Sequence, residues 1–366
     1  MIKQLYLLVI LLIINGCTLI MPHLVPFDDL PEPTGPFNVG TRVFEWTDVL
    51  REEWFTKDSN DFRKLVVQVW YPTMEESDEG ISYLDFPEKR IVPLSKRIEL
   101  PQYLIRHIQD VKTNSILNAS VRKSNDLYPL ILFSHGLGGM RMQNTVQMEE
   151  LASRGYVVLA MDHTYDANVT VFSDGSIAEF RSGLREDATE QEFWDIRIPQ
   201  INTRAADLTF ILDNINQYQG DRNQLWQSID LSKVGAFGHS FGGATSVVAS
   251  FRDPRIDACI NLDGWMEPIN SKIIQEGLKV PFLYIGQERW INTPLNDIKL
   301  DSLIKSSNGN KELLLGTKHF DYSDTPQFTP ISSKLGIAGT MDMNILREKI
   351  NSEIVSFFDL HLKDVK

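Results

Sequence analysis

The pentapeptide Gly-His-Ser-Phe-Gly at 238–242 constrains the fold of this chain more than any other feature, because it directly follows the apolar run 234–237. A serine with glycines two residues before and two after it is typical of a sharp turn from a strand into a helix, where the backbone is strained and crowded. The small residues of 243–249 then predict a helix that packs closely against a sheet. The sequence therefore predicts Ser240 as a nucleophile exposed at such a turn; an idle serine in a glycine-rich turn is the alternative.

A serine hydroxyl becomes nucleophilic when an imidazole takes its proton and a carboxylate orients that imidazole. With this type of turn, the chain order is Ser, then Asp or Glu, then His. Of the seven histidines, His319 and His361 follow Ser240 with carboxylates in between. His361 lies in a final amphipathic run and is expected on a helix surface. His319 follows the apolar run 312–316 and is expected on a loop at the carboxyl end of the last strand, which predicts it as the base.

Two strand ends compete for the acid. Asp263 stands directly between an apolar strand and a glycine, whereas Glu288 follows the next apolar strand. Asp162 and Asp166 precede the serine, which makes them poor partners in this chain order. We assign Asp263, with Glu288 as the alternative acid and a turn or helix-capping role as the alternative for Asp263 itself.

An oxyanion hole needs backbone N–H groups aimed at the charge that develops on the carbonyl oxygen. Phe241, next to the nucleophile, is expected to supply one. The apolar run 129–133 is followed by Ser-His-Gly-Leu-Gly-Gly, a loop in which Leu137 is expected to donate the second N–H and His135 to shape the backbone. Three side chains that flank the proposed triad are expected to line the acyl pocket, with a core role as the alternative: Trp265, Met266 and Phe320.

The periodicity of the chain alternates between strands and helices. Strands are predicted near 41–46, 64–71, 129–134, 156–162, 233–238, 257–263, 280–286 and 312–316, with helices such as 142–154 and 203–215 between them. This alternation predicts an α/β fold with a mostly parallel sheet covered on both faces, in one catalytic domain over 37–366. The segments 75–128 and 164–200 are polar, irregular and long, and are expected to frame or cover the active site.

Charge and composition exclude several functions. The formal net charge is −13 with 36 basic residues, and no basic cluster is present that could neutralise nucleic acid phosphates. The histidines are scattered, and Cys259 lies inside a predicted strand as an expected core residue, so neither a metal nor another cofactor is expected. These observations leave a small-molecule substrate as the expected partner.

The N-terminus predicts a secretory leader over residues 1–17. The apolar stretch from Leu5 to Ile14 is too short to favour a spanning helix. A cysteine after a small residue resembles a bacterial lipoprotein cleavage box, so Cys17 is expected to carry lipid and anchor the protein to a membrane of the cell envelope. Ordinary cleavage or an uncleaved anchor is the alternative, because Asn15 is not the usual small residue. Residues 18–36 are expected to form a polar tether.

Four segments together resemble the plasma-type platelet-activating factor acetylhydrolase family. They are Gly-Leu-Gly-Gly at 136–139, Gly-His-Ser-Phe-Gly-Gly at 238–243, Leu-Asp-Gly-Trp-Met at 262–266 and Lys-His-Phe at 318–320. The resemblance covers most of the mature chain, and its most specific part is an acid on the strand that follows the nucleophile. It implies an α/β-hydrolase fold, no metal, and the same nucleophile, acid, base and oxyanion donors as assigned above.

The resemblance also implies a serine carboxylic ester hydrolase that cleaves short or oxidised sn-2 acyl chains of phospholipids, besides simple esters. Bacterial relatives of this design include broad esterases and polyester hydrolases, so a secreted esterase with no phospholipid substrate is the alternative. A serine peptidase, an acyltransferase and a binding protein on an inactive scaffold are further alternatives. The chain departs from the family in the stretch 85–118, which is rich in charged and polar residues and shows no strongly apolar surface helix for docking to lipid particles.

Overall fold

A computed structural model of the chain describes residues 26–77, 79–184, 187–218, 224–290, 293–329 and 331–363. The predicted leader with Cys17 and residues 18–25 of the predicted tether lie outside the described residues. Within the part that is described, no helix is both long enough and apolar enough to cross a membrane.

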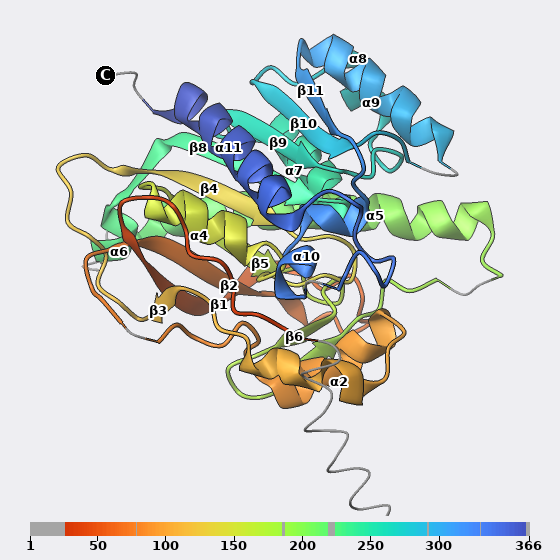
Figure 1. The fold of residues 1–366 in the computed structure, drawn as a ribbon. Coiled ribbons are helices and arrows are strands. Elements are labelled where there is room, and N and C mark those ends of the chain that lie inside the picture. Colours follow the sequence, from red (N-terminus) through yellow and green to blue (C-terminus); the bar gives the residue numbers. More distant parts are fainter. Residues whose placement is uncertain are drawn as a thin grey trace, which may run out of the picture.

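A nine-stranded sheet runs through the centre of the molecule in the order β11-β10-β9-β8-β4-β5-β2-β1-β3 (Figure 1). The strands from β5 to β11 pair in parallel, whereas β2 is antiparallel to both of its neighbours. Each of the eight predicted strands overlaps an observed one, and the predicted α/β architecture with a mostly parallel sheet is confirmed. The strands are β1 (Asn38–Glu52), β2 (Phe62–Thr73), β3 (Ser115–Leu117), β4 (Tyr128–Ser134), β5 (Val157–Asp162), β8 (Ile229–His239), β9 (Ala258–Leu262), β10 (Phe282–Gln287) and β11 (Asn310–Leu314).

Helices cover both faces of the sheet, because side chains of a strand alternate between its two faces. Leu130 and Leu132 of β4 belong to the core under α5 and α7, and Ile131 and Phe133 belong to the core under α4 and α11. The helices are α2 (Pro87–Arg97), α3 (Gln102–Ile105), α4 (Thr145–Ser153), α5 (Glu190–Tyr218), α6 (Gln224–Gln227), α7 (Phe241–Arg252), α8 (Ser271–Glu276), α9 (Pro294–Ser307), α10 (Thr325–Phe328) and α11 (Met343–Leu362), with 3₁₀ turns η1 (Arg106–Asp110) and η2 (His319–Tyr322).

Two segments that the sequence predicts as irregular contain regular structure. The stretch 75–128 holds α2, α3, η1 and β3, and the stretch 164–200 holds a hairpin of β6 (Val169–Val171) and β7 (Ile177–Glu179) together with the start of α5. The hairpin strands are too short to show an alternating pattern. Helix α5 begins well before the predicted start at 203 and runs through Pro199, a residue that normally signals a helix start or break.

The predicted tether over 18–36 also needs correction, because residues 26–36 belong to the folded domain. The backbone N–H groups of Asp28 and Leu30 donate to the carbonyls of Phe328 and Lys112 at 2.8 and 2.9 Å. Leu30 is buried in a small core beside α2 and α3. The polar, proline-rich composition of this segment reflects an extended chain laid along the domain and not a free linker.

Candidate active site

Ser240 lies at the predicted turn between β8 and α7. Its backbone has φ 59° and ψ −123°, a region that residues other than glycine rarely adopt. The flanking glycines are needed because the backbone is crowded: a Cβ on Gly238 would lie 2.3 Å from the Gly242 carbonyl oxygen, and one on Gly242 would lie 1.9 Å from the Ser134 carbonyl oxygen. The strand, strained turn and helix predicted from the sequence are all present.

The structure brings Ser240, His319 and Asp263 into one chain of hydrogen bonds. The distance from His319 Nε2 to Ser240 Oγ is 2.9 Å, and the distance from His319 Nδ1 to Asp263 Oδ2 is 2.6 Å. The Ser240 N–H donates to the Leu262 carbonyl and the Asp263 N–H donates to the Ile285 carbonyl, which ties the ends of β8, β9 and β10 together. Asp263 is fully buried, whereas the His319 side chain keeps 29% of its surface exposed.

The Asp263 carboxylate accepts four hydrogen bonds besides that of His319. Oδ1 accepts from the Tyr284 hydroxyl at 3.0 Å, the Gln287 N–H at 3.1 Å and Trp290 Nε1 at 3.2 Å, and Oδ2 accepts from Gln287 Nε2 at 2.9 Å. Such donors are what a buried carboxylate needs to remain ionised. Because an ionised carboxylate only accepts, His319 Nδ1 carries a proton toward it, and Nε2 of the neutral ring is left to accept the Ser240 proton.

The other sequence candidates lie elsewhere. Glu288 is exposed, and His361 is exposed on α11 with its ring against Phe357. Asp162 pairs with Arg90 and Arg141. The predicted choice of Asp263 and His319 therefore agrees with their position at the serine, but the bonds from Tyr284, Gln287 and Trp290 were not predicted, because side chains on β10 and its following loop reach Asp263 only through the pairing of two strands.

The loop after β4 lies against the nucleophile. A Cβ built on Gly136 would come 3.3 Å from Ser240 Cβ. Among the hydrogen bonds of the described residues, neither the Leu137 N–H nor the Phe241 N–H has a protein acceptor. Phe241 is also the first residue of α7, where the helix dipole favours negative charge. Phe241 directly follows Ser240, and Leu137 directly follows the Gly136 that lies against it, so both N–H groups suit an oxyanion hole, and this role stays a prediction.

His135 and His239 shape the backbone around the serine. Burial, together with Arg204, lowers the pKa of His135 to about 3, and its neutral ring donates from Nδ1 to the Gly136 carbonyl at 2.6 Å. Burial likewise holds the pKa of His239 well below its usual value. The shaping role expected of His135 matches this geometry.

His239 links the loop of the candidate base to the loop after β4. Its Nε2 donates to the His319 carbonyl at 2.9 Å, and its Nδ1 accepts from Gln143 Nε2 at 2.6 Å. Gln143 Oε1 in turn accepts from the Gly136 N–H at 3.1 Å. The sequence analysis missed both His239 and Gln143, since nothing in a linear pattern marks the middle residue of the motif as a bridge.

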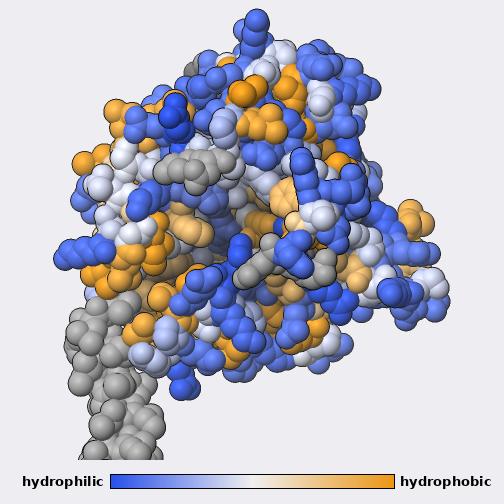
Figure 2. All heavy atoms as spheres, turned by 90° about the vertical axis from the view of Figure 1, so that its right-hand side faces the viewer, coloured by the Kyte–Doolittle hydropathy of each residue, from blue (hydrophilic) through white to orange (hydrophobic). Residues whose placement is uncertain are grey.

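The three expected pocket residues differ in their surroundings. Trp265 is half-buried, with its ring 5.7 Å from that of Phe241 and 5.6 Å from that of Phe193. Phe320 is 50% exposed beside the His319 ring. Met266 is fully buried in the core, which favours the core alternative for this residue. The parallel strands point their carboxyl ends to the right of Figure 1, and the face seen from that side is hollowed near its centre, with hydrophobic side chains around the hollow (Figure 2).

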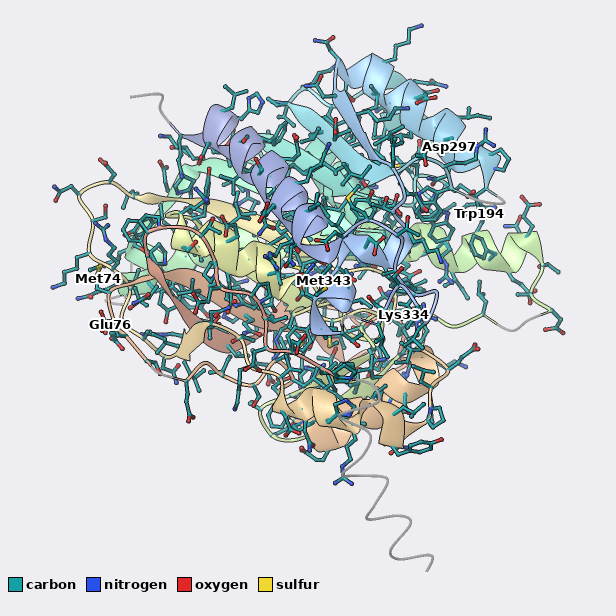
Figure 3. All side chains as sticks on the ribbon, viewed as in Figure 1. Met74, Glu76, Trp194, Asp297, Lys334 and Met343 are labelled. Carbon is teal, nitrogen blue, oxygen red and sulfur yellow. The ribbon has the colours of Figure 1, made fainter. Side chains whose placement is uncertain are left out.

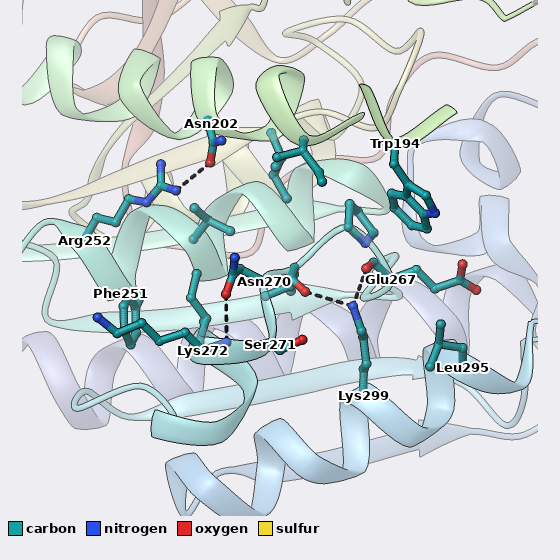
Figure 4. A pocket seen from close by; sticks show the side chains of 16 residues that line it. Trp194, Asn202, Phe251, Arg252, Glu267, Asn270, Ser271, Lys272, Leu295 and Lys299 are labelled. Carbon is teal, nitrogen blue, oxygen red and sulfur yellow. Dashed lines mark hydrogen bonds between the residues drawn. The ribbon is translucent and has the colours of Figure 1, made fainter. Parts of the chain in front are cut away.

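A pocket of about 520 Å³ lies between α5, α7, α9 and the loop that precedes α8 (Figure 4). Neither Ser240 nor His319 lines it. Trp194 closes one end, on the same side of the molecule as Asp297 of α9 (Figure 3). The Trp194 ring packs edge-on against Phe193, which in turn contacts Trp265, so this pocket adjoins the aromatic side chains next to the serine.

Comparison with known proteins gives consistent matches. A family model described as platelet-activating factor acetylhydrolase, isoform II, matches residues 26–366. Platelet-activating factor acetylhydrolase of Canis lupus familiaris is 29% identical, over 91% of this chain and 77% of its own, and a probable 1-alkyl-2-acetylglycerophosphocholine esterase of Arthroderma benhamiae is 27% identical, over 87% and 81%. The solved structure of a ferulic acid esterase from Streptomyces cinnamoneus superposes with a TM-score of 0.73 and 28% identity, over 92% of this chain and 93% of that one.

Proposed function

Because the chain belongs to the platelet-activating factor acetylhydrolase isoform II family of ester hydrolases, we propose that it is a serine hydrolase that cleaves short-chain acyl esters, including sn-2 acyl esters of phospholipids. The observation that carries the proposal is the unbroken contact from Asp263 through His319 to Ser240, with distances of 2.6 and 2.9 Å. These distances suit proton transfer from a hydroxyl to an oriented imidazole.

The reaction follows from the position of the protons. Ser240 Oγ attacks the ester carbonyl while His319 Nε2 takes the hydroxyl proton, and the Asp263 carboxylate stabilises the imidazolium that forms. The N–H groups of Leu137 and Phe241 bind the oxyanion. His319 then returns the proton to the leaving alcohol, an acyl-enzyme remains on Ser240, and a water molecule repeats the sequence to release the acid. The groups required for this cycle are all side chains and backbone of this chain.

Two observations bear on the substrate. The named activities of the relatives favour an acetyl or other short acyl group on a glycerophospholipid. The aromatic contacts from Phe241 through Trp265 to Phe193, together with the ferulic acid esterase neighbour, favour a second candidate, a broad esterase that accepts aromatic acyl groups and no phospholipid.

One assay separates these candidates. Acid release is measured from sn-2 acetyl and sn-2 palmitoyl phosphatidylcholine, p-nitrophenyl acetate and methyl ferulate, with Ser240→Ala as control. Preference for the acetyl lipid supports the acetylhydrolase proposal, whereas turnover of p-nitrophenyl acetate or methyl ferulate without either lipid supports the broad esterase. Turnover by Ser240→Ala that equals the wild type would remove the serine mechanism itself.

We further propose that Cys17 carries a lipid anchor outside the cytoplasm, as its sequence context suggests. Expression of the full chain with labelled palmitate, followed by detergent phase partition, tests this. Label and detergent-phase recovery that disappear in Cys17→Ser support the anchor, and label retained by that variant contradicts it.

A further inference from the structure

A second Ser-His-Asp arrangement lies inside the molecule, beneath the loop that follows β4. Ser134 Oγ is 2.9 Å from His163 Nε2, and His163 Nδ1 is 2.8 Å from Asp207 Oδ2. All three residues have no exposed surface. Because no substrate can reach Ser134, this buried triad cannot catalyse a reaction. Its role is therefore structural, and it depends on which segments the triad contacts.

The protons of the buried triad follow from its charges. Burial alone would raise the pKa of Asp207. The Arg63 guanidinium nevertheless holds this pKa far below its usual value. Burial, with Arg204 nearby, holds the pKa of His163 well below its usual value, so the ring is neutral. His163 Nδ1 therefore donates a hydrogen bond to Asp207, and His163 Nε2 accepts a hydrogen bond from the Ser134 hydroxyl. The lone pairs of Ser134 Oγ are free to accept a hydrogen bond from another donor.

Arg204 of α5 is that donor, and it also contacts both segments that carry the candidate oxyanion N–H groups. Its Nη2 donates to Ser134 Oγ at 3.1 Å and to the carbonyl oxygen of His135, two residues before Leu137. Its guanidinium lies over the Phe241 ring, 5.0 Å from the centroid. One buried side chain thus connects the loop after β4 with the first residue of α7.

This guanidinium is costly to bury. Arg204 has no exposed surface, and its Nε and Nη1 are without a hydrogen-bond partner among the described residues. Burial lowers the pKa of Arg204 only to about 10, so it keeps its charge at neutral pH. Unpaired buried donors destabilise a fold. An apolar side chain of similar length would fill the same space without that cost, so the cation is better explained by the two segments that it fixes.

We propose that Arg204 is a positioning residue that holds the N–H groups of Leu137 and Phe241 at the separation an oxyanion requires. This inference rests on the proposed function, and it adds a residue on α5 to that reaction. Preorganised donors are effective because they need no rearrangement when charge develops, and a small displacement of either donor lowers the rate. Arg204 acts through the His135 carbonyl on one side and the Phe241 ring on the other, and it has no role in contacting the substrate.

The test compares Arg204→Met with Arg90→Met, a matched loss of a buried arginine. Arg90 is equally buried, but it pairs with Asp85, Asp162 and the Val169 carbonyl and contacts neither donor segment. The measurements are kcat and KM for p-nitrophenyl acetate and the inhibition constant of an aryl trifluoromethyl ketone, whose serine adduct carries an oxyanion. Each value is normalised to the folded fraction from near-UV circular dichroism.

For Arg204→Met we expect kcat to fall about 10²-fold, KM to change less than about twofold, and ketone affinity to fall with kcat/KM. Arg90→Met should lower stability and leave kcat per folded molecule within about threefold. A kcat for Arg204→Met that matches Arg90→Met, or a loss confined to KM, overturns the inference.

If Arg204→Met does not fold, Arg204→Lys decides. Lysine keeps the charge but is shorter and has no planar guanidinium to lie over the Phe241 ring, so kcat should fall at least about fivefold with ketone affinity falling in parallel. Wild-type kcat in Arg204→Lys contradicts the inference. Activity in Ser240→Ala would instead remove the proposed function, so the two failures are distinguishable.

Discussion

The two Ser-His-Asp arrangements of this protein have nearly the same internal distances and opposite surroundings. In Ser240-His319-Asp263 the two contacts are 2.9 and 2.6 Å, and in Ser134-His163-Asp207 they are 2.9 and 2.8 Å. His319 is 29% exposed, whereas His163 is fully buried beneath the loop after β4. The two serines also differ in their backbone, since Ser240 is strained at a turn and Ser134 ends a regular strand. Hydrogen-bond geometry therefore defines a proton path, but access and neighbouring donors decide whether that path can serve a reaction.

Replacing each serine by alanine should give the largest difference in kcat between the two arrangements. We expect Ser240→Ala to lower kcat for p-nitrophenyl acetate by about 10⁶-fold, the effect seen when a triad nucleophile is removed. Ser134→Ala should lower kcat by less than about tenfold, because the Arg204 bond to the His135 carbonyl remains. Equal losses in the two variants, measured in the same steady-state assay, would contradict the division of roles.

Replacing each aspartate should separate catalysis from stability. Asp263→Asn should lower kcat by about 10⁴-fold, because the amide favours the wrong tautomer of His319. Asp207→Asn should instead lower the free energy of unfolding by about 3–5 kcal/mol, since it leaves Arg63 buried with less compensating charge. Steady-state kinetics and urea denaturation of both variants check this. An unchanged kcat in Asp263→Asn would contradict the orienting role of Asp263.

Gly242 follows Ser240 by two residues and packs against the backbone of Ser134, where an added Cβ would lie 1.9 Å from the carbonyl oxygen. We expect Gly242→Ala to lower the free energy of unfolding by about 1–3 kcal/mol through overpacking and to lower kcat as the strand end moves. Gly183→Ala is the matched control, because its Cβ would lie 3.6 Å from the nearest heavy atom, a Phe180 ring carbon. Coinciding denaturation curves of Gly242→Ala and Gly183→Ala would contradict this expectation, because they would show that β4 can shift with no loss of unfolding free energy.

The smallest expected effect concerns pH. Burial depresses the pKa of His163 in the fold, so below about pH 6.5 the unfolded state binds a proton that the folded state does not. The contribution of His163 to stability is complete above that pH and falls by up to about 1.4 kcal/mol per pH unit as the pH decreases. His163→Gln should reduce the slope of unfolding free energy against pH between 6.5 and 5 by that amount. An unchanged slope would mean that His163 is protonated in the fold.

Much of the fold and of the first arrangement could be predicted, and nothing of the second. Ser240, Asp263 and His319 each follow an apolar strand, and parallel strands bring their carboxyl ends to one edge, so linear order suffices to place them together. Ser134, His163 and Asp207 meet through the register of β4 with β5 and the way α5 packs on that sheet. Their sequence order differs from the one that the serine motif predicts. Side-chain contacts across packed layers leave no periodic signal in a single sequence.

The same limit explains the supports of Asp263 and the course of α5. Gln287 and Tyr284 reach Asp263 because β9 and β10 pair in register. In the sequence, position 284 is only part of an apolar strand and position 287 only marks its end, so neither indicates a contact with Asp263. The first turns of α5 lie in the polar stretch 164–200, which shows no apolar stripe and contains Pro199, a residue that lacks the N–H of a regular helical turn.

Because residues 26–36 pack on the domain, only the residues before Pro26 could form a tether to a membrane. If Cys17 carries a lipid, eight residues lie between it and Pro26, and the nine Cα–Cα steps of a fully extended chain span about 30 Å. The tether leaves the domain beside Phe27, whose ring stacks on His107 near the small core around α2 and α3. A lipid at Cys17 would thereby keep Pro26 within about 30 Å of the membrane surface. Esters in or just above the anchoring membrane would then meet the active site at a far higher effective concentration than esters in the bulk.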